Sequence, residues 1–438
     1  MAAAIALPLT SGRAAPAGGW NLVNSPSTND GGDDILLGTT CANAQECWAV
    51  GADLPPQGNG ASPIVQEWDG SSWSFVATPT TAGSGSAFFS VTCVTSSDCW
   101  SVGALLGATG NPAGPLAENW DGSSWSVVST PDVVGAAGAV LQSVSCVSAS
   151  DCWAVGDTTD AAGTGLGSIA LHWDGTTWTM VPTAPTGQTD EQLNGVTCVA
   201  ADNCWAVGAA GPNQENPNFL PIFPGAVGDQ GIIEHWDGAS WTLVPSFAAS
   251  PPDGGWVSSV MCVSADDCWA AGATTGDTGS QSGPLMQQWD GSTWSVVPTP
   301  AAPTGNGILS SVTCLSADQC WASGSSGNIG GGGNTVANPL IDEWNGSIWS
   351  IQPSPSVTAL AFLTAITCAR GDACWSVGSA VVNVGANQAG FNPLVEQMVL
   401  PPDGTQGFVA ASSDGGVYSF GAFPFLGSMG GTHLARPV

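Results

Sequence analysis

The cysteines are the residues of this sequence whose spacing most clearly implies chemistry. All 14 fall into seven pairs with one spacing, Cys-x5-Cys, and a Trp follows each second cysteine. Such a pair can form a disulfide or bind a metal. Zinc sites usually combine cysteines about two to four residues apart with a second pair or with histidines, and this chain has only three His. We therefore predict seven structural disulfides, which pair Cys41 with Cys47, Cys93 with Cys99, Cys146 with Cys152, Cys198 with Cys204, Cys262 with Cys268, Cys314 with Cys320 and Cys368 with Cys374.

The 21 tryptophans are a second candidate for chemistry, because indole rings stack on sugars. Nineteen of them recur with the cysteine pairs: seven follow the second cysteine, and twelve flank six Trp-(Asp/Asn)-Gly-x-x-Trp motifs. Trp20 also matches the repeat, and Trp256 occupies a position that is mostly apolar in the other units. Since these residues recur in every unit, we predict that they form a core between units and not a ligand platform.

Acidic residues recur just before the first tryptophan of the motif. A pair of carboxylates would suffice for glycoside hydrolysis, but repetition in successive units favours a solvated strand edge. His172 and His235 occupy equivalent places in adjacent units. Packed sheets stand about 10 Å apart, too far for both rings to bind one metal, so we predict polar strand positions. No nucleophile-elbow motif is present. The acids are Glu67, Glu118, Glu234, Asp342, Glu343 and Glu396.

The repeat period predicts the architecture that positions these residues. Successive second cysteines are 52, 53, 52, 64, 52 and 54 residues apart, and a period near 50 is typical of propeller blades. Each unit contains four candidate strands, and Asp-Gly or Asn-Gly turns mark a hairpin between the last two. Helical periodicity is absent. The predicted fold is an all-β, seven-bladed propeller with four-stranded blades and one disulfide per blade.

The two ends of the repeat region predict how the ring closes. Seven cysteine hairpins are present but only six tryptophan hairpins, and the last unit lacks its fourth strand. Residues 20–26 match residues 73–79 in type, so we expect the N-terminal strand to complete the last blade and remove its open edge. A small residue stands three positions before each first cysteine, which suits crowding of the innermost strands around the axis. These residues are Gly38, Ser90, Ser143, Gly195, Ser259, Ser311 and Ala365.

The units resemble those of photosystem II stability/assembly-factor-like propellers and, less closely, Asp-box (bacterial neuraminidase repeat) propellers. The resemblance rests on the runs Cys47-Trp48-Ala49-Val50-Gly51 and Trp68-Asp69-Gly70-Ser71-Ser72-Trp73, with cysteine where that family has glycine. It covers residues 20 to about 400 and implies the propeller fold. It says little about function, because propellers support binding, scaffolding and catalysis.

The Asp-box resemblance raises sialidase activity, which the composition argues against. Sialidases hold the substrate carboxylate with three clustered arginines and use a tyrosine nucleophile. The three arginines of this chain are Arg13 in the first residues, Arg370 in a cysteine loop and Arg436 near the other end. Tyr418 is the one tyrosine and lies outside the repeats. A secreted carbohydrate-active hydrolase that uses a carboxylate pair, and is not a sialidase, stays open as the alternative function.

Charge and the first residues predict where the protein works. The formal net charge is −31 without any lysine, so nucleic acid and anionic lipid are disfavoured partners and weak recruitment of Ca²⁺ is favoured. Residues 1–17 contain a short apolar run followed by Ala15-Pro16-Ala17, as in a secretory signal peptide. No later stretch is long enough to span a membrane. We expect a secreted or cell-wall-associated monomer that needs no cofactor.

We expect a non-catalytic binding or scaffold module, with a glycan or protein partner at the variable loops between strands 2 and 3 and between blades. The insertion in the fourth unit, residues 212–223, is the candidate ligand loop. Beyond the propeller, 18–400, the tail 401–438 contains the run Gly407-Phe408-Val409-Ala410-Ala411-Ser412-Ser413-Asp414-Gly415-Gly416-Val417-Tyr418-Ser419-Phe420-Gly421. This run resembles one unit of a repeat in actinobacterial secreted and cell-wall-associated proteins. The loop candidates are Asn213, Gln214, Glu215, Asn218, Phe219 and Phe223.

Overall fold

The computed structural model confirms the all-β class. The described residues form strands and turns and no helix, and their strands include seven four-stranded antiparallel sheets. The described ranges are 19–28, 32–56, 60–79, 85–107, 110–161, 165–188, 190–211, 230–245, 254–275, 281–328, 336–355, 360–369, 373–385, 388–399, 407–411 and 417–421.

Each sheet is one blade, which we number I to VII from the N-terminal side and describe from the axis outward. Blades I to III are β2 (Asp33–Asn43), β3 (Glu46–Leu54), β4 (Ser62–Trp68), β5 (Trp73–Phe75); β6 (Ser86–Thr95), β7 (Asp98–Leu106), β8 (Pro112–Trp120), β9 (Trp125–Val127); and β10 (Gly138–Ser148), β11 (Asp151–Thr159), β12 (Gly165–Trp173), β13 (Trp178–Val181). Blades IV and V are β14 (Asp190–Ala200), β15 (Asn203–Gly211), β16 (Gln230–Trp236), β17 (Trp241–Leu243); and β18 (Gly254–Ser264), β19 (Asp267–Thr275), β20 (Gln281–Trp289), β21 (Trp294–Val296). Blades VI and VII are β22 (Gly307–Ser316), β23 (Gln319–Asn328), β24 (Val336–Trp344), β25 (Trp349–Gln352); and β26 (Ala361–Ala369), β27 (Ala373–Gly385), β28 (Gln388–Val399), β1 (Trp20–Leu22).

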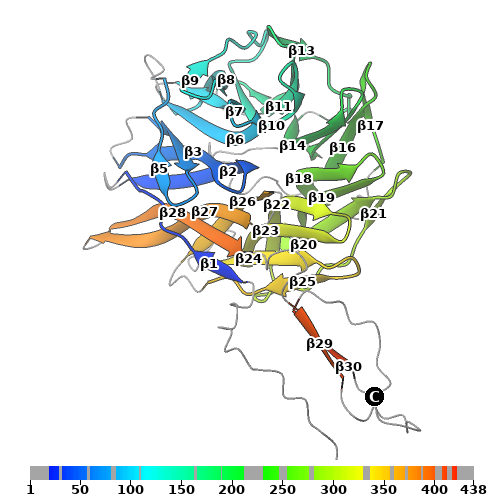
Figure 1. The fold of residues 1–438 in the computed structure, drawn as a ribbon. Helices are drawn as coiled ribbons and strands as arrows, with labels where there is room; N and C mark the ends of the chain where they lie inside the picture. The colour runs from blue at the N-terminus through cyan, green and yellow to red at the C-terminus, as the bar shows by residue number, and fades with distance from the viewer. Residues whose placement is uncertain are drawn as a thin grey trace, which may run out of the picture.

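The seven blades close into a ring (Figure 1). The innermost strand of each blade contacts those of its two neighbours, and β2 contacts both β6 and β26. β1 supplies the outermost strand of blade VII, with Trp20 opposite Met398 in the antiparallel register. The predicted closure by the N-terminal strand is confirmed. β29 (Gly407–Ala411) and β30 (Val417–Gly421) pair with each other and with no other described strand.

The small residues before each first cysteine lie where neighbouring inner strands come closest. A Cβ on Gly38 would stand 2.8 Å from the Phe89 carbonyl oxygen of the next blade, so the predicted crowding is confirmed there. Where the residue is serine, its hydroxyl accepts a hydrogen bond from the next inner strand. The pairs are Ser90 with Val144 N, Ser143 with Val196 N, Ser259 with Val312 N, and Ser311 with Ile366 N.

The core lies between blades, in interfaces that we call seams. In seam I–II, Trp48 packs against Trp120 at 4.9 Å and edge-on against Trp125 at 5.3 Å between ring centroids. Five further seams repeat this trio, and in seam VI–VII Trp321 shares a buried cluster with Trp20. These contacts confirm that the recurring tryptophans are inter-blade core. The other trios are Trp100 with Trp173 and Trp178, Trp153 with Trp236 and Trp241, Trp205 with Trp289 and Trp294, Trp269 with Trp344 and Trp349, and Trp375 with Trp68 and Trp73.

Trp256, the exception in the sequence, is also core: it is 2% exposed and packs with Ala209, Ala273 and Ile308. Alternating strand direction gives the ring two distinct faces. The disulfide face carries the loops between strands 1 and 2 and the turns between strands 3 and 4. The linker face carries the loops between strands 2 and 3 and the linkers that join one blade to the next.

Candidate functional site

All seven predicted disulfides are present, and each joins the first two strands of its blade. They bond Cys41 to Cys47, Cys93 to Cys99, Cys146 to Cys152, Cys198 to Cys204, Cys262 to Cys268, Cys314 to Cys320 and Cys368 to Cys374. The second cysteine of each pair is 0% exposed, so its sulfur lies in a seam and away from any ligand; these residues are Cys47, Cys99, Cys152, Cys204, Cys268, Cys320 and Cys374. The cysteines are structural residues and form no binding site.

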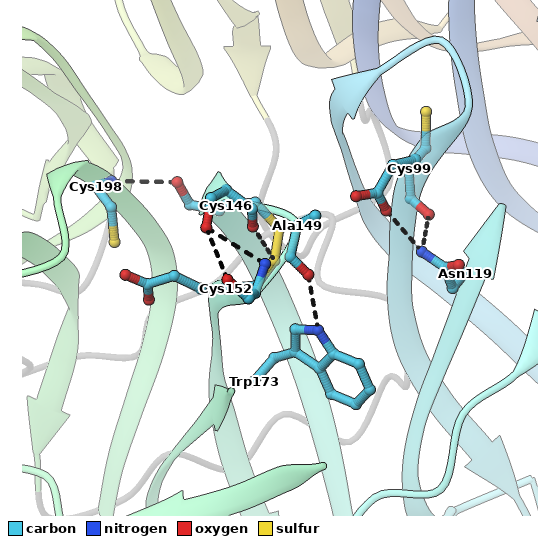
Figure 2. Close-up of a disulfide and its surroundings, with 12 residues drawn as sticks. Cys99, Asn119, Cys146, Ala149, Cys152, Trp173 and Cys198 are labelled. Atoms are coloured by element: carbon cyan, nitrogen blue, oxygen red, sulfur yellow. Dashed lines mark hydrogen bonds between the residues drawn. A yellow bond between two sulfur atoms is a disulfide. The ribbon is translucent and has the colours of Figure 1, made fainter. Parts of the chain in front are cut away.

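In five blades the loop that the disulfide closes is also held by an indole. Figure 2 shows Cys146 bonded to Cys152, with the Trp173 Nε1–H donating to the Ala149 carbonyl oxygen in the loop between them at 3.1 Å. The same indole bond recurs in four other blades. Among the described residues, no three His, Cys, Asp or Glu side chains converge to hold a metal ion.

The acids before the hairpin tryptophan occupy two different environments, and the prediction of one solvated edge is wrong for four of them. Glu67 and Glu343 directly precede the tryptophan and remain partly exposed. The acids one position earlier point into the seam, because successive strand residues face opposite sides of a sheet. These four, the seam carboxyls, are each 0% exposed: Glu118, Glu234, Asp342 and Glu396.

The same position holds an uncharged residue in the other three blades: Gln66 in blade I, Leu171 in blade III and Gln287 in blade V. The residue directly opposite on the fourth strand is apolar and about half exposed in all seven blades, as with Val127 opposite Glu118. These apolar side chains stand at the rim of the ring, between the buried polar residue and solvent. They are Leu22, Phe75, Val127, Met180, Leu243, Val296 and Ile351.

Burial sets the protonation of the seam carboxyls. Desolvation raises the pKa of each one to about 7. At Glu234 the Ala184 N–H opposes this shift and nearby Glu191 adds to it. A side chain that is 0% exposed cannot reach a substrate, so these acids cannot form the carboxylate pair of a hydrolase. They belong to the seams.

In blades II to V the residue directly before the hairpin tryptophan pairs with the residue that precedes the second cysteine. His172 Nε2 lies 2.9 Å from Asp151 Oδ1, and His235 Nε2 lies 3.0 Å from Asn203 Oδ1. Each histidine also packs on the tryptophan of its own second strand. The prediction that both histidines are polar strand positions is confirmed.

Blade I breaks this pairing rule, because Glu46 and Glu67 meet where blade V has Asp267 and Gln288. Desolvation, then Glu46 and Asp69, raise the pKa of Glu67. Glu67→Gln should therefore stabilise the protein at pH 7 by about 1 kcal/mol, since the new amide can donate to Glu46 as Gln288 Nε2 does to Asp267 Oδ1 at 3.0 Å. Thermal unfolding measures the change. The reciprocal Gln288→Glu should destabilise, and a Glu67→Gln protein that melts below wild type would refute the pairing.

The linker face carries a groove of about 730 Å³ beside the outer edge of blade II, a size suited to a small ligand. Its walls are the end of β7, the first half of β8, and the linker that leads from β9 into β10. Thr130 Oγ1 donates to the Pro115 carbonyl oxygen at 3.0 Å and holds the linker across the strand. The lining is mostly apolar, with exposed Asp132 at one side. No motif or spacing in the sequence predicts this groove.

Asp157, also on the linker face, differs from the residue type that the other blades have at its position. It follows the glycine of the second strand, where the other six blades have buried alanine or serine. Gln142 Nε2 donates to its Oδ1 at 3.2 Å, and burial raises the pKa of Asp157 to about 6. A carboxyl placed where the fold needs only a small side chain is the kind of signal that marks function in a repeat protein, and aligning the seven units would have revealed it.

The candidate ligand loop, residues 212–223, lies outside the described residues. Its two ends do not: Gly211 ends β15 and Gln230 begins β16, both on the linker face. The two ends of the blade IV loop, the groove of blade II and Asp157 of blade III therefore belong to one face of three consecutive blades.

Comparison with models of known protein families gives no match, and comparison with curated proteins gives none either. Solved structures do match. YCF48 from Cyanidioschyzon merolae aligns with a TM-score of 0.51 and 13% identity over 87% of this chain and 99% of that one. An ulvan lyase of polysaccharide lyase family PL25, bound to -[GlcA(1-4)Rha3S]-, aligns with a TM-score of 0.52 and 8% identity over 83% and 93% of the two chains.

At these identities the matches show a shared fold. They agree with the predicted resemblance to the photosystem II assembly-factor type of propeller at the level of architecture. Within the described residues, no helix has the length and apolar character needed to cross a bilayer. The chain has the fold of a seven-bladed β-propeller with one disulfide in each blade.

Proposed function

We propose that this chain is an extracellular, non-catalytic binding or scaffold module that captures a glycan or protein partner on its linker face. The observation that carries the proposal is the groove of blade II, a recess of about 730 Å³ with polar and apolar lining on the face that also bears the variable loops. The disulfide face is built from repeated short turns, which suits a rigid support.

Extracellular placement is supported by the cysteines. Seven disulfides and no free cysteine are typical of chains that fold in an oxidising compartment. We propose residues 1–17 as a signal peptide, 18–400 as the propeller, and 401–438 as a separate tail, with secretion or cell-wall association as the destination. The Asp-box and actinobacterial resemblances of the repeats and the tail are part of this proposal, as is a monomeric state.

A side chain that fills the groove tests the site. Gly114 lines the groove, and a Cβ there meets nothing within 4 Å, so Gly114→Leu should fold normally and reduce ligand capture at least tenfold. Gly283 is the equivalent residue of blade V and is equally open, which makes Gly283→Leu the matched control. The readouts are a glycan array, pull-down from culture fluid, and the thermal midpoint. Equal capture by both variants would exclude the groove as the site.

Deleting residues 212–223 tests the candidate ligand loop separately. If this loop holds the partner, the deletion should abolish capture and leave thermal stability unchanged; unchanged capture would restrict binding to the groove. Asp157→Ala introduces the alanine that four other blades have at this position, and it measures how much Asp157 contributes to capture. A panel of glycosidase substrates accompanies each variant, and turnover by wild type would overturn the non-catalytic assignment in favour of a carboxylate-pair hydrolase.

A further inference from the structure

Six of the seven seams bury a polar side chain at one equivalent position of the third strand. In each case the side chain is no more than 1% exposed. Blade III, with Leu171, is the exception. Two of the six are neutral amides and four are carboxyls, so the position accepts a polar group without charge. The six are Gln66, Glu118, Glu234, Gln287, Asp342 and Glu396.

In blades I, IV and VII the partner of this side chain comes from the linker that enters the blade. Ser25 Oγ donates to Gln66 Oε1 at 2.6 Å, and Gln66 Nε2 donates to the Pro26 carbonyl oxygen at 2.9 Å. In blade VII, Ser354 Oγ donates to Glu396 Oε1 at 2.7 Å. In these three blades the buried side chain therefore ties the incoming linker to the third strand, across the seam.

The carboxyls are only partly satisfied. Oε2 of Glu396 and Oε1 of Glu234 have no hydrogen-bond partner in the part of the chain that the structure describes, and both oxygens of Glu118 and of Asp342 have none. A buried carboxylate without partners is far more costly than a buried neutral carboxyl. The geometry thus suits the protonated form, as the amides of blades I and V already indicate.

No described side chain can neutralise these groups when they ionise. The sequence has no lysine, and its three arginines lie outside the described residues. Around Glu118, the walls from blade I are Trp48, Val50 and Val65, and desolvation is its one influence. Desolvation is also the one influence on the pKa of Asp342. At Glu396 the hydrogen bond from the Ser354 hydroxyl opposes the effect of desolvation on the pKa.

Glu234 is the one seam carboxyl that faces another acid. Glu191, from the inner strand of the same blade, adds repulsion once both are charged. His235 and Glu343, the nearest titratable neighbours along the third strands, point to the opposite side of their sheets because they are adjacent in sequence. No cationic side chain among the described residues therefore balances charge in any of the four seams.

We propose that the four seam carboxyls are proton-operated latches, which leave seams I–II, III–IV, V–VI and VI–VII closed while protonated and loosen them when ionised, because the buried charge lacks sufficient hydrogen-bond partners there. Seam II–III, closed by Leu171, stays shut at every pH. The ring thus carries a built-in response to acidification, independent of any ligand.

The direction follows from linkage. Burial raises the pKa of each latch to about 7, above the ordinary values of 4.5 for Glu and 3.8 for Asp, so the folded chain binds more protons than the unfolded chain between these limits. The stability that the protonated latches contribute is fully present below about pH 4 and is lost as the pH rises through about 7. Each glutamate latch should raise the unfolding equilibrium constant up to about 300-fold at alkaline pH.

The test compares wild type with the amide variant of all four latches, E118Q/E234Q/D342N/E396Q, from pH 4.5 to 8.5. Thermal midpoints should fall steeply across this range for wild type and much less for the variant, in which Asp157 still titrates. Native-state hydrogen exchange, corrected for intrinsic rates, should show β8 and β9 opening with pH in wild type but not in the single variant E118Q. Exchange of β8 and β9 that rises equally in wild type and E118Q, or a quadruple variant with the wild-type slope, would overturn the proposal.

A variant that adds a seam carboxyl keeps the proposal testable if the quadruple variant folds poorly. Gln66→Glu should add a fifth latch in seam VII–I, leave the midpoint near that of wild type at pH 4.5, and lower it further at pH 8. A Gln66→Glu protein whose midpoint falls with pH as in wild type and no faster would also overturn the proposal.

Discussion

Reduction of all seven disulfides is expected to lower the midpoint of thermal unfolding by about 20 °C. The two cysteines of each bridge are six residues apart. In the loop-entropy model, closing a loop of that length lowers the entropy of the unfolded chain and so stabilises the folded state by about 2.3 kcal/mol. Seven such contributions act on a ring of roughly 380 residues, whose unfolding entropy corresponds to about 0.8 kcal/mol per degree. The bridges thus account for a large part of its resistance to heat.

The comparison needs oxidised and fully reduced protein, with the thiol count checked by mass spectrometry and the midpoint by calorimetry. The second cysteine of each pair is 0% exposed, so reduction is carried out in denaturant before refolding. The double variant with Cys314→Ala and Cys320→Ala serves if the reduced chain does not refold, and it should lose about 3 °C. A reduced ring that melts within a few degrees of the oxidised one would show that packing between the blades alone sustains the fold.

Blade count, disulfides and ring closure were predictable because each depends on local pairing repeated seven times. A short hairpin between two cysteines fixes its own register, and the residue types around Trp20 match those of the fourth strands in blades I to VI. The inter-blade role of the tryptophans followed from the same repetition. These features need no knowledge of how distant segments meet.

The seam carboxyls were mispredicted because acids at two adjacent positions were treated as one set. Glu343 directly precedes Trp344 and is partly exposed, whereas its neighbour Asp342 is fully buried. A shift of one residue along a strand exchanges the solvent side for the packed side. Asp342 and Glu343 stand side by side in the sequence, and that pair alone shows that both positions cannot share one environment.

The groove lay beyond sequence reasoning for another reason. Its walls combine β8 with a linker whose path is set by tertiary contacts such as Thr130 to Pro115. Linkers differ in length and composition from blade to blade, so no repeat predicts their course. Asp157 differs in this respect, since its position belongs to the repeat and only its residue type departs from it.

Removing residues 1–28 is expected to destabilise the ring by at least about 5 kcal/mol, whereas removing residues 1–17 should leave the thermal midpoint unchanged. The longer truncation takes away β1, whose Trp20 is 6% exposed and packs in one cluster with Trp321. Loss of a buried tryptophan alone costs about 3 to 5 kcal/mol. It also exposes the edge of β28 along its pairing with β1.

The residues that follow β1 add to this loss. Ser27 Oγ and Thr28 N donate to Asp34 Oδ2 at 2.6 and 2.7 Å, and Asp34 is 1% exposed. Without these donors a buried carboxylate would lose the hydrogen bonds that offset its desolvation. Blade VII and its seam with blade I should therefore open before the rest of the ring.

Hydrogen exchange of β27 and β28 measures this opening directly, and the thermal midpoint gives its global cost. Trp20→Ala in the 18–438 chain is the intermediate variant, because it keeps the strand and the Asp34 donors but removes the indole. Its midpoint should fall between those of the two truncations. If the chain without residues 1–28 instead melts with the chain that lacks only 1–17, then the three-stranded remainder of blade VII closes the ring by itself, and the N-terminal strand covers an edge that the fold does not need to protect.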